Sequence, residues 1–266
     1  MSGRMSLIRE RGFTLVELMV ALLISTILLG AIFQNFVATQ RSYRLLEGLT
    51  QLQENARFSM YMLGVSARSA GYRSDTEVSS QRAFPAGGVA PASAAAFGVS
   101  GQVVTGLNND AAVAAVLDGT DSISIRYQGN ADGTTVDCLG AAVAADAVAM
   151  NTFYVDTTNE LQCSNGVNDF PLADGVENMQ VLYGLDTDGD EAADVYRNAA
   201  GIAGNTWRNV VSVRIAMLFT TVDPVPTGTG ASTGRFTLLD NAQQVFADDF
   251  RRQMFVTTIN LRNMTL

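Results

Sequence analysis

The chain contains no histidine, and all 17 of its basic residues are arginine. The absence of histidine excludes Ser-His-Asp and Cys-His catalysis and histidine-ligated zinc. The absence of lysine excludes Schiff-base chemistry and the lysine of a Walker A phosphate loop. Carboxylates alone support some reactions, but none are paired here in a pattern that indicates acid–base catalysis. We therefore predict a structural or binding protein rather than an enzyme, without an organic cofactor.

Positive charge is also scarce. The 266 residues include 17 basic and 26 acidic side chains, which gives a formal charge of −9. An acidic chain is poorly suited to binding a phosphate backbone, so no nucleic acid is expected as a partner. The length is sufficient for one sizeable domain or two small ones.

In contrast, apolar residues are concentrated in a long run near the N-terminus. From Phe13 to Phe33 the only charged residue is Glu17. As a helix rising ~1.5 Å per residue, this run spans the ~30 Å hydrocarbon core of a bilayer. A carboxylate within it is costly and is expected only if it gains a specific partner. The plainer interpretation is a signal anchor with Glu17 near the membrane interface.

The start of this run resembles a known export signal. The stretch Arg11-Gly12-Phe13-Thr14-Leu15-Val16-Glu17 is similar to the class III leader of type IV pilins and type II secretion pseudopilins. The resemblance implies that a prepilin peptidase cleaves between Gly12 and Phe13 and methylates the new N-terminus. It also implies that Glu17 neutralises the α-amine of a neighbouring subunit in an apolar filament core. Two charges that are each costly in lipid would then form one pair.

A second pattern extends the helix beyond the membrane. Apolar or small residues recur at steps of three and four, which indicates an amphipathic helix; they are Leu45, Leu49, Leu52, Ala56, Ser59 and Leu63. No proline precedes Pro85, and Gly71 is a plausible helix end. We predict a leader at 1–12, a stem helix over 13–71 that is roughly 85 Å long, and a head over 72–266. The first ~21–25 residues of the stem would span the membrane.

Two stretches of the stem resemble the PilW-like minor pilins in particular. They are Gln53-Glu54-Asn55-Ala56-Arg57-Phe58 and the helix end Ala70-Gly71-Tyr72. On periodicity alone, Gln53-Glu54-Asn55 predicts only a solvated helix face. In the head, Asp137-Cys138 and Phe153-Tyr154-Val155-Asp156 are also similar to that branch.

The head has the alternating pattern of β-strands. Alternation at 123–127, 211–219 and 255–261 predicts antiparallel strands with one buried face. Residues 152–155 and 161–163 predict a hairpin around Thr157-Thr158-Asn159, and 176–185 predicts a further strand. Residues 83–120 predict loops with short irregular elements, and residues 223–234 predict a loop. The fold class is therefore α+β, with a long N-terminal helical stem packed on a mainly antiparallel β-sheet head, the architecture that the pilin resemblance also implies.

Cys138 and Cys163 are the two cysteines of the chain. An even count in an exported protein favours one disulfide. Closing this loop is worth ~3 kcal/mol on the chain-entropy account. Two free thiols are the alternative, and two cysteines are too few for a zinc site.

The sharpest local motif of the head is acidic. In the stretch 186–194, carboxylates at relative positions 1, 3, 5 and 9 match a calcium loop; they are Asp186, Asp188, Asp190 and Asp194. Position 6, usually glycine, is Glu191, and position 12, usually glutamate, is Arg197. Calcium and a solvated acidic turn are the two interpretations.

The resemblance implies a minor pilin of a type IV pilus. Such a protein is made as a single-pass inner-membrane precursor with its head in the periplasm, and then enters a surface pilus. Expected partners are prepilin peptidase, the inner-membrane assembly platform, other minor pilins, the major pilin and a possible tip adhesin. With them the chain would prime assembly or cap the tip, for adhesion and twitching motility. The alternatives are a minor pseudopilin of type II secretion and a membrane-tethered calcium-dependent adhesin.

Overall fold

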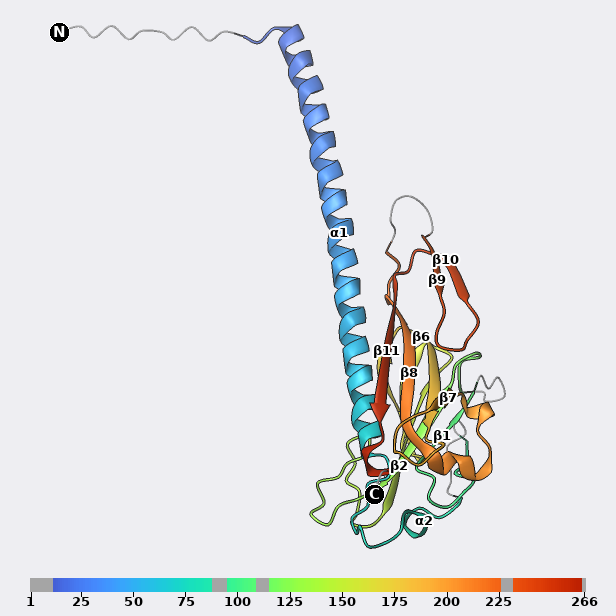
Figure 1. Ribbon diagram of the computed structural model, residues 1–266. Coiled ribbons are helices and arrows are strands. Elements are labelled where there is room, and N and C mark those ends of the chain that lie inside the picture. Colours follow the sequence, from blue (N-terminus) through green and yellow to red (C-terminus); the bar gives the residue numbers. More distant parts are fainter. Residues whose placement is uncertain (1–11, 88–94, 109–114, 226–231, 265–266) are drawn as a thin grey trace, which may run out of the picture. The chain divides into compact units, whose positions relative to one another are not determined.

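The computed structural model describes residues 12–87, 95–108, 115–225 and 232–264 (Figure 1). The predicted leader, apart from Gly12, lies outside these residues. The chain divides into two compact units, Met1–Leu46 and Glu47–Leu266. One continuous helix, α1 (Leu15–Ser69), begins in the first unit and continues into the second.

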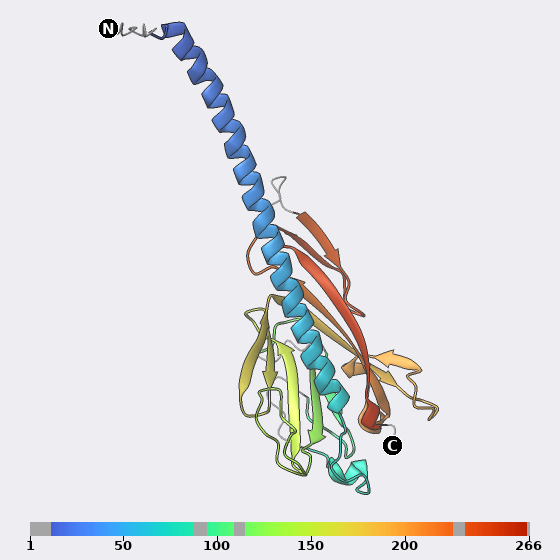
Figure 2. The same cartoon turned by 90° about the vertical axis from the view of Figure 1, so that its left-hand side faces the viewer.

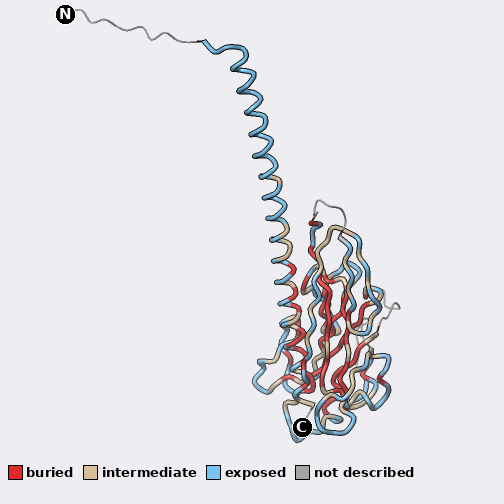
Figure 3. The backbone as a smooth tube through the Cα atoms, turned by 45° about the horizontal axis from the view of Figure 1, so that its top comes forward, coloured by how far each residue is buried: buried red, intermediate tan, exposed pale blue. Residues whose placement is uncertain are grey.

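The first part of α1 is apolar and exposed. Every side chain from Phe13 to Phe36 is exposed to solvent, and Figure 3 shows this part of the chain as exposed. Among the described residues, α1 is the one helix long and apolar enough, by length and composition, to cross a membrane. Exposed hydrocarbon on this scale has to be covered by lipid or by another protein.

The later part of α1 has one buried stripe, which confirms the predicted stripe from Leu52 to Leu63, whereas the predicted members Leu45 and Leu49 are only half-buried. Leu52, Ala56, Ser59, Leu63 and Ala67 are buried, and the apolar members of this stripe belong to the main core of the second unit. The helix ends just before Gly71, whose φ of +72° suits glycine. Residues 47–69 of the stem are therefore part of the head's own core.

Two antiparallel sheets complete this core, and the expected α+β class is confirmed. The first sheet has five strands in the order β1-β2-β3-β4-β5. They are β1 (Val104–Leu107), β2 (Ser122–Gln128), β3 (Val148–Val155), β4 (Glu160–Ser164) and β5 (Asp169–Asp174). The predicted hairpin is confirmed as β3 and β4, with Asn159 in its turn at a φ of 62°.

The second sheet has four strands in the order β11-β8-β6-β7. They are β6 (Val176–Leu185), β7 (Val195–Arg197), β8 (Val210–Thr220) and β11 (Arg252–Asn260). Figure 2 shows the later part of α1 in front of both sheets. The short helices α2 (Ser80–Ala83), η1 (Ala199–Gly201), η2 (Gly204–Asn209) and η3 (Arg262–Met264) lie in the connections.

The loop predictions are wrong at two places. Residues 83–120 include β1, which is only four residues long and contains a glycine, so its alternation is too short to be recognised. Residues 223–234 run into β9 (Ser232–Phe236), which pairs with β10 (Gln244–Asp248) as a separate hairpin. Glycine at position 234 argues for a loop in the sequence, yet it is paired with Phe246.

The prediction of one buried face is also wrong for the central strands. In β8, Ile215, Met217 and Phe219 belong to the main core, as expected. The alternate residues Ala216 and Leu218 are buried as well, because the β9–β10 hairpin and the residues joining its strands pack over them. In β2 every residue from Ser122 to Tyr127 is buried. Alternation in the sequence does not reveal a second covering layer supplied by a distant segment.

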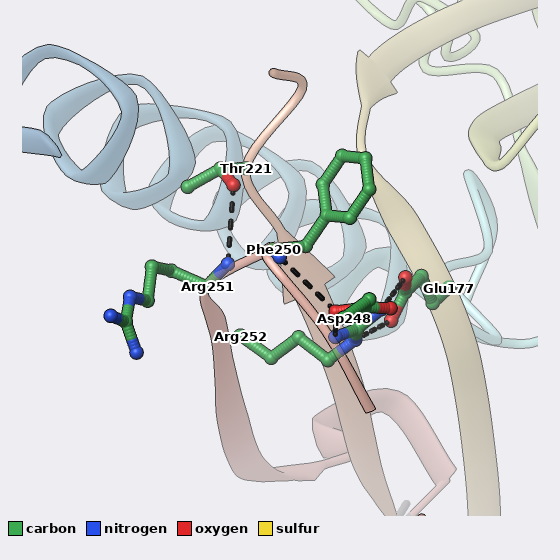
Figure 4. Close-up of polar contacts among 6 residues, drawn as sticks. All are labelled: Glu177, Thr221, Asp248, Phe250, Arg251 and Arg252. Atoms are coloured by element: carbon green, nitrogen blue, oxygen red, sulfur yellow. Dashed lines mark hydrogen bonds and ion pairs between the residues drawn. The ribbon is translucent and has the colours of Figure 1, made fainter. Parts of the chain in front are cut away.

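An ion-pair cluster holds the β9–β10 hairpin to the second, four-stranded sheet (Figure 4). The Arg252 side chain at the start of β11 is 5% exposed. Its guanidinium donates one hydrogen bond of 2.8 Å to Oε1 of Glu177, a residue of β6. It donates another of 2.8 Å to Oδ2 of Asp248, a residue of β10. It also lies 3.8 Å from the centre of the Phe246 ring. Hydrogen bonds from Arg252 lower the pKa of Asp248 from its usual value.

This cluster predicts part of the acid sensitivity of the head. Because the pKa of Asp248 is lower in the folded state, its stabilising contribution is complete above the unfolded value of about 3.9 and is lost as pH falls through the folded value. The side chain of Asp248 is 37% exposed, so solvent screening limits the contribution to ~1 kcal/mol. In thermal unfolding from pH 5 to pH 2, Asp248→Asn should lose less stability than the parent chain. Identical pH profiles would contradict this role.

Candidate functional site

The predicted cleavage site lies just before the helix. Gly12, Phe13 and Thr14 are outside regular secondary structure, and Phe13 is 85% exposed. A peptidase can therefore reach the bond between Gly12 and Phe13 without unwinding α1. The geometry is compatible with the predicted processing, which remains a prediction.

Thr14 and Glu17 together start the helix. The Glu17 N–H donates to Thr14 Oγ1 at 3.3 Å, and the Leu18 N–H donates to the Thr14 carbonyl at 3.2 Å. Thr-x-x-Glu at this position is the sequence of a capping box. Glu17 in the first turn also has a favourable interaction with the helix dipole. Glu17 thus helps to start the helix, a role separate from the assembly role that the resemblance to pilin leaders implies.

The carboxylate of Glu17 is exposed and forms no ion pair with any residue that the structure describes. Its predicted partner, the α-amine of another subunit, would be available only after cleavage and assembly. Its predicted role in assembly is therefore carried forward as a proposal.

The disulfide is present, so the alternative of two free thiols is wrong. Cys138 and Cys163 are joined, with their Cα atoms 6.4 Å apart. The Cys138 N–H donates to Asn151 Oδ1 at 3.1 Å, and Asn151 Nδ2 donates to Ser66 Oγ at 3.2 Å. This chain of contacts connects the disulfide loop to β3 and to α1.

The stretch Gln53–Phe58 has two different sides. On the inner side, Ala56 is fully buried and Asn55 Nδ2 donates to the Asp174 carbonyl at 3.0 Å, which ties α1 to the end of β5. On the outer side, Glu54 and Arg57 form an exposed ion pair at 3.7 Å, and Phe58 is 46% exposed. The expectation of a solvated face therefore holds for Gln53 and Glu54, which are exposed, but is wrong for Asn55.

The end of the helix is tied to β2 by backbone hydrogen bonds. The Gly71 N–H donates to the Arg126 carbonyl at 3.0 Å, and the Gln128 N–H donates to the Tyr72 carbonyl at 2.9 Å. The Ala-Gly-Tyr sequence therefore marks the point where the stem turns into the sheet.

The acidic stretch forms a tight loop between β6 and β7. Side-chain oxygens of Asp186, Asp188 and Asp194 lie within 4.8 Å of one another. Asp186 accepts the Gly189 N–H at 2.6 Å and the Glu191 N–H at 2.9 Å. Asp194 accepts hydrogen bonds from both the backbone and the hydroxyl of Thr187, and these bonds lower its pKa. Three of the four predicted carboxylates thus converge in this loop.

Two details of this loop bear on cation binding. Asp190 is not in the converged group, and its carboxylate accepts the Ala192 N–H at 2.8 Å. Glu191 has a φ of 67°, the left-handed conformation for which position 6 of a calcium loop normally uses glycine. The residue at position 6 departs from the motif, but its backbone does not.

Known protein families match the chain in two places, one near the N-terminus and one in the C-terminal half. Residues 7–33 match the prokaryotic N-terminal methylation motif. Residues 142–263 match the family described as type IV pilus-assembly protein W, a range that runs from just before β3 to η3. These two matches identify the chain as PilW-like, with a prepilin-type N-terminus.

One solved structure similar to this PilW-like chain is a type IV-like pilin from Thermus thermophilus. The two chains are 13% identical, with a TM-score of 0.47 over 80% of this chain and 98% of the pilin. A search of curated proteins finds no matching sequence. A PilW-like head with a prepilin leader indicates assembly with other pilins, and such a leader and apolar helix indicate a membrane-anchored precursor.

Sequence reasoning missed Arg126, a buried cation in the PilW-like head. Its guanidinium donates to the carbonyls of Phe84, Pro85 and Gln102, and it lies 4.3 Å from the centre of the Phe97 ring. Burial lowers the pKa of Arg126 to about 10, so it is charged at neutral pH. Arg126 thus fastens the connection between α2 and β1 onto β2. A single arginine within a β pattern gives no signal for such a role.

Proposed function

We propose that this PilW-like protein is a minor pilin that primes assembly of a type IV pilus or caps its tip. Prepilin peptidase would cleave after Gly12 and methylate Phe13, and Glu17 would pair with the new α-amine of a neighbour. The precursor would be single-pass, with its head in the periplasm. The mature chain would join other minor pilins, the major pilin and a possible tip adhesin on the inner-membrane assembly platform, for adhesion and twitching motility.

The observation that carries this proposal is the combination of a prepilin leader and a PilW-family head on one helix. The bond to be cut is exposed, the helix behind it is apolar and exposed, and the later part of that helix belongs to the head's core. A function based on packing needs these features and no reactive centre. The absence of histidine and lysine fits such a function.

A deletion strain tests this proposal against the type II secretion alternative. Loss of surface pili, restored by the intact gene, would support a minor pilin. Loss of secreted enzymes with normal pili would instead assign the chain to secretion. Normal pili and normal secretion would contradict both assignments.

We also propose that the 186–194 loop binds calcium. The converged carboxylates of Asp186, Asp188 and Asp194 provide hard oxygen ligands, which calcium prefers. Three carboxylates so close together repel one another, and a divalent cation would relieve that repulsion. A pocket of about 300 Å³ lies beside them and is lined by Asp186, Glu191, Arg208 and neighbouring residues.

The expected result is a rise in melting temperature on adding calcium. At a calcium concentration a hundredfold above Kd, binding raises the free energy of unfolding by ~2.7 kcal/mol. Asp188→Ala should abolish the rise. Glu191→Gly removes the same charge at a position that favours glycine, so this control should keep the rise. A parent chain that melts identically in calcium and in chelator would rule out this site.

A further inference from the structure

The outer edge of β11 has unpaired backbone groups. The Thr221 N–H donates to the Arg251 carbonyl at 2.9 Å, and the Leu261 N–H donates to the Val211 carbonyl at 2.8 Å. These two bonds bracket β11 and show that its odd-numbered residues form the hydrogen bonds to β8. The even-numbered residues from Met254 to Asn260 therefore direct their N–H and C=O groups away from the sheet. Within the described residues, these groups have no hydrogen-bond partner.

The other edges of the two larger sheets are protected in ways that β11 is not. β1 has four residues and β7 has three. β5 contains Pro171, carries an aspartate at each end, and has a register shift against β4. β11 has nine residues, with no proline, glycine or charge from 253 to 260 and no shift against β8. Short length, charge, proline and bulges are the usual defences against strand addition, and β11 lacks all four beyond Arg252.

The side chains along this edge define what would fit. On the outer face, Met254 is 40% exposed and Val256 is 50% exposed. Towards the end of the strand lies a groove of about 290 Å³, lined by Arg68 of α1, by residues 257–260 and by Arg262. Arg68 is exposed and forms no ion pair within the part of the chain that the structure describes. The complementary segment is extended, apolar where it passes Val256, and acidic where it passes Arg68.

We propose that β11 accepts an extended segment of a different, neighbouring pilin as an added strand. This inference rests on the proposed function, because it requires the chain to assemble with other pilins. A row of backbone donors and acceptors at two-residue spacing is satisfied by another strand.

A second copy of this chain is a poor occupant of the edge. Two-fold pairing of β11 with itself would be antiparallel. Since residues 47–69 of α1 run alongside β11 (Figures 1 and 2), such pairing would also reverse the direction of the second stem. Residues 47–69 of the two copies would then run antiparallel, whereas stems that leave the same membrane side by side must run parallel.

Proline substitution at Val256 tests the edge in the full chain in cells. Val256→Pro removes an N–H that faces outward and leaves the bonds to β8 intact, which an edge strand tolerates. Val256→Lys adds a charge of the kind that protects natural edges. Each change should reduce the amount of the chain in sheared filaments by at least tenfold, relative to the processed chain in membranes. The matched control Val256→Ala keeps the N–H and should stay within about twofold of the parent.

A photoreactive benzoylphenylalanine at position 256 identifies the occupant. The expected product joins position 256 to an extended segment of another pilin, as read from the crosslinked peptide. The same probe at Val167, which is 86% exposed and lies outside the strands, should not give this product. Crosslinking of position 256 to β11 of a second copy would overturn the proposal. So would normal incorporation of both Val256→Pro and Val256→Lys in a strain whose deletion phenotype shows that the minor pilin function itself is correct.

Discussion

Replacing Glu17 by alanine should leave the chain cleaved after Gly12 but reduce its amount in sheared filaments by at least about tenfold. The proposed partner of this carboxylate is the α-amine of a neighbouring Phe13. Without the carboxylate, that amine would remain as an unpaired charge in an apolar core, which costs several kcal/mol. The measurement is quantitative immunoblotting of filament and membrane fractions, with cleavage followed by the mass of the chain.

Two further variants separate the charge of Glu17 from its part in starting the helix. Glutamine at the same position can still complete the capping box with Thr14, but it carries no charge. Glu17→Gln should therefore fail in assembly as Glu17→Ala does. Glu47→Ala removes an exposed acid further along the same helix and should assemble normally. Normal incorporation of Glu17→Gln would mean that Glu17 acts through capping alone.

Removing the disulfide should lower the free energy of unfolding of the head by ~3 kcal/mol, the value for closing a loop with a sequence separation of 25. The loss of stability should not be smaller than this value, because Cys163 is fully buried and the backbone of Cys138 also contacts Asn151. For a domain of this size, the melting temperature should fall by roughly 6–12 °C. Thermal unfolding of the full-length chain in detergent, with both cysteines changed to serine, measures this fall.

Reduction of the parent protein provides the control for this variant. The parent chain treated with a reductant should have the same melting temperature as the double serine variant, since both lack the same bond. Reductant should not change the melting of the variant. If the oxidised parent and the double variant melt together, the disulfide contributes nothing to stability, contrary to this expectation.

The features predicted best from sequence are those set by local patterns. The buried stripe of Leu52, Ala56 and Leu63 follows from helical spacing, and the end of α1 follows from Gly71. The hairpin with Asn159 in its turn and the strand Val176–Leu185 are also local signals. Each of these depends on residues that are close in the sequence.

The features that were missed depend on distant segments. Ala216 and Leu218 are buried because Leu238 and its neighbours pack over them, and nothing near residue 216 in the sequence indicates this. The contact of Asn55 with Asp174 and the ion pair of Arg252 with Glu177 each join residues far apart in the chain. Arginine in a β pattern is compatible with either a solvated or a buried position, and only the tertiary structure decides between them.

The acidic loop illustrates both situations. The spacing of Asp186, Asp188 and Asp194 was sufficient to predict that these carboxylates come together. It could not show that Asp190 turns to the Ala192 N–H, or that Glu191 adopts the backbone conformation of the expected glycine. Spacing predicts which carboxylates are candidates, whereas only the folded loop shows which of them converge.

The most direct test of the proposed function is mass spectrometry of sheared surface filaments, searching for the N-terminal peptide of the mature chain. The proposal predicts a peptide that begins with methylated Phe13 and contains Glu17. This peptide would establish cleavage, methylation and entry into a surface pilus together. Filaments that lack it, with only chains retaining residues 1–12 in the membrane, would contradict the assignment as a processed minor pilin.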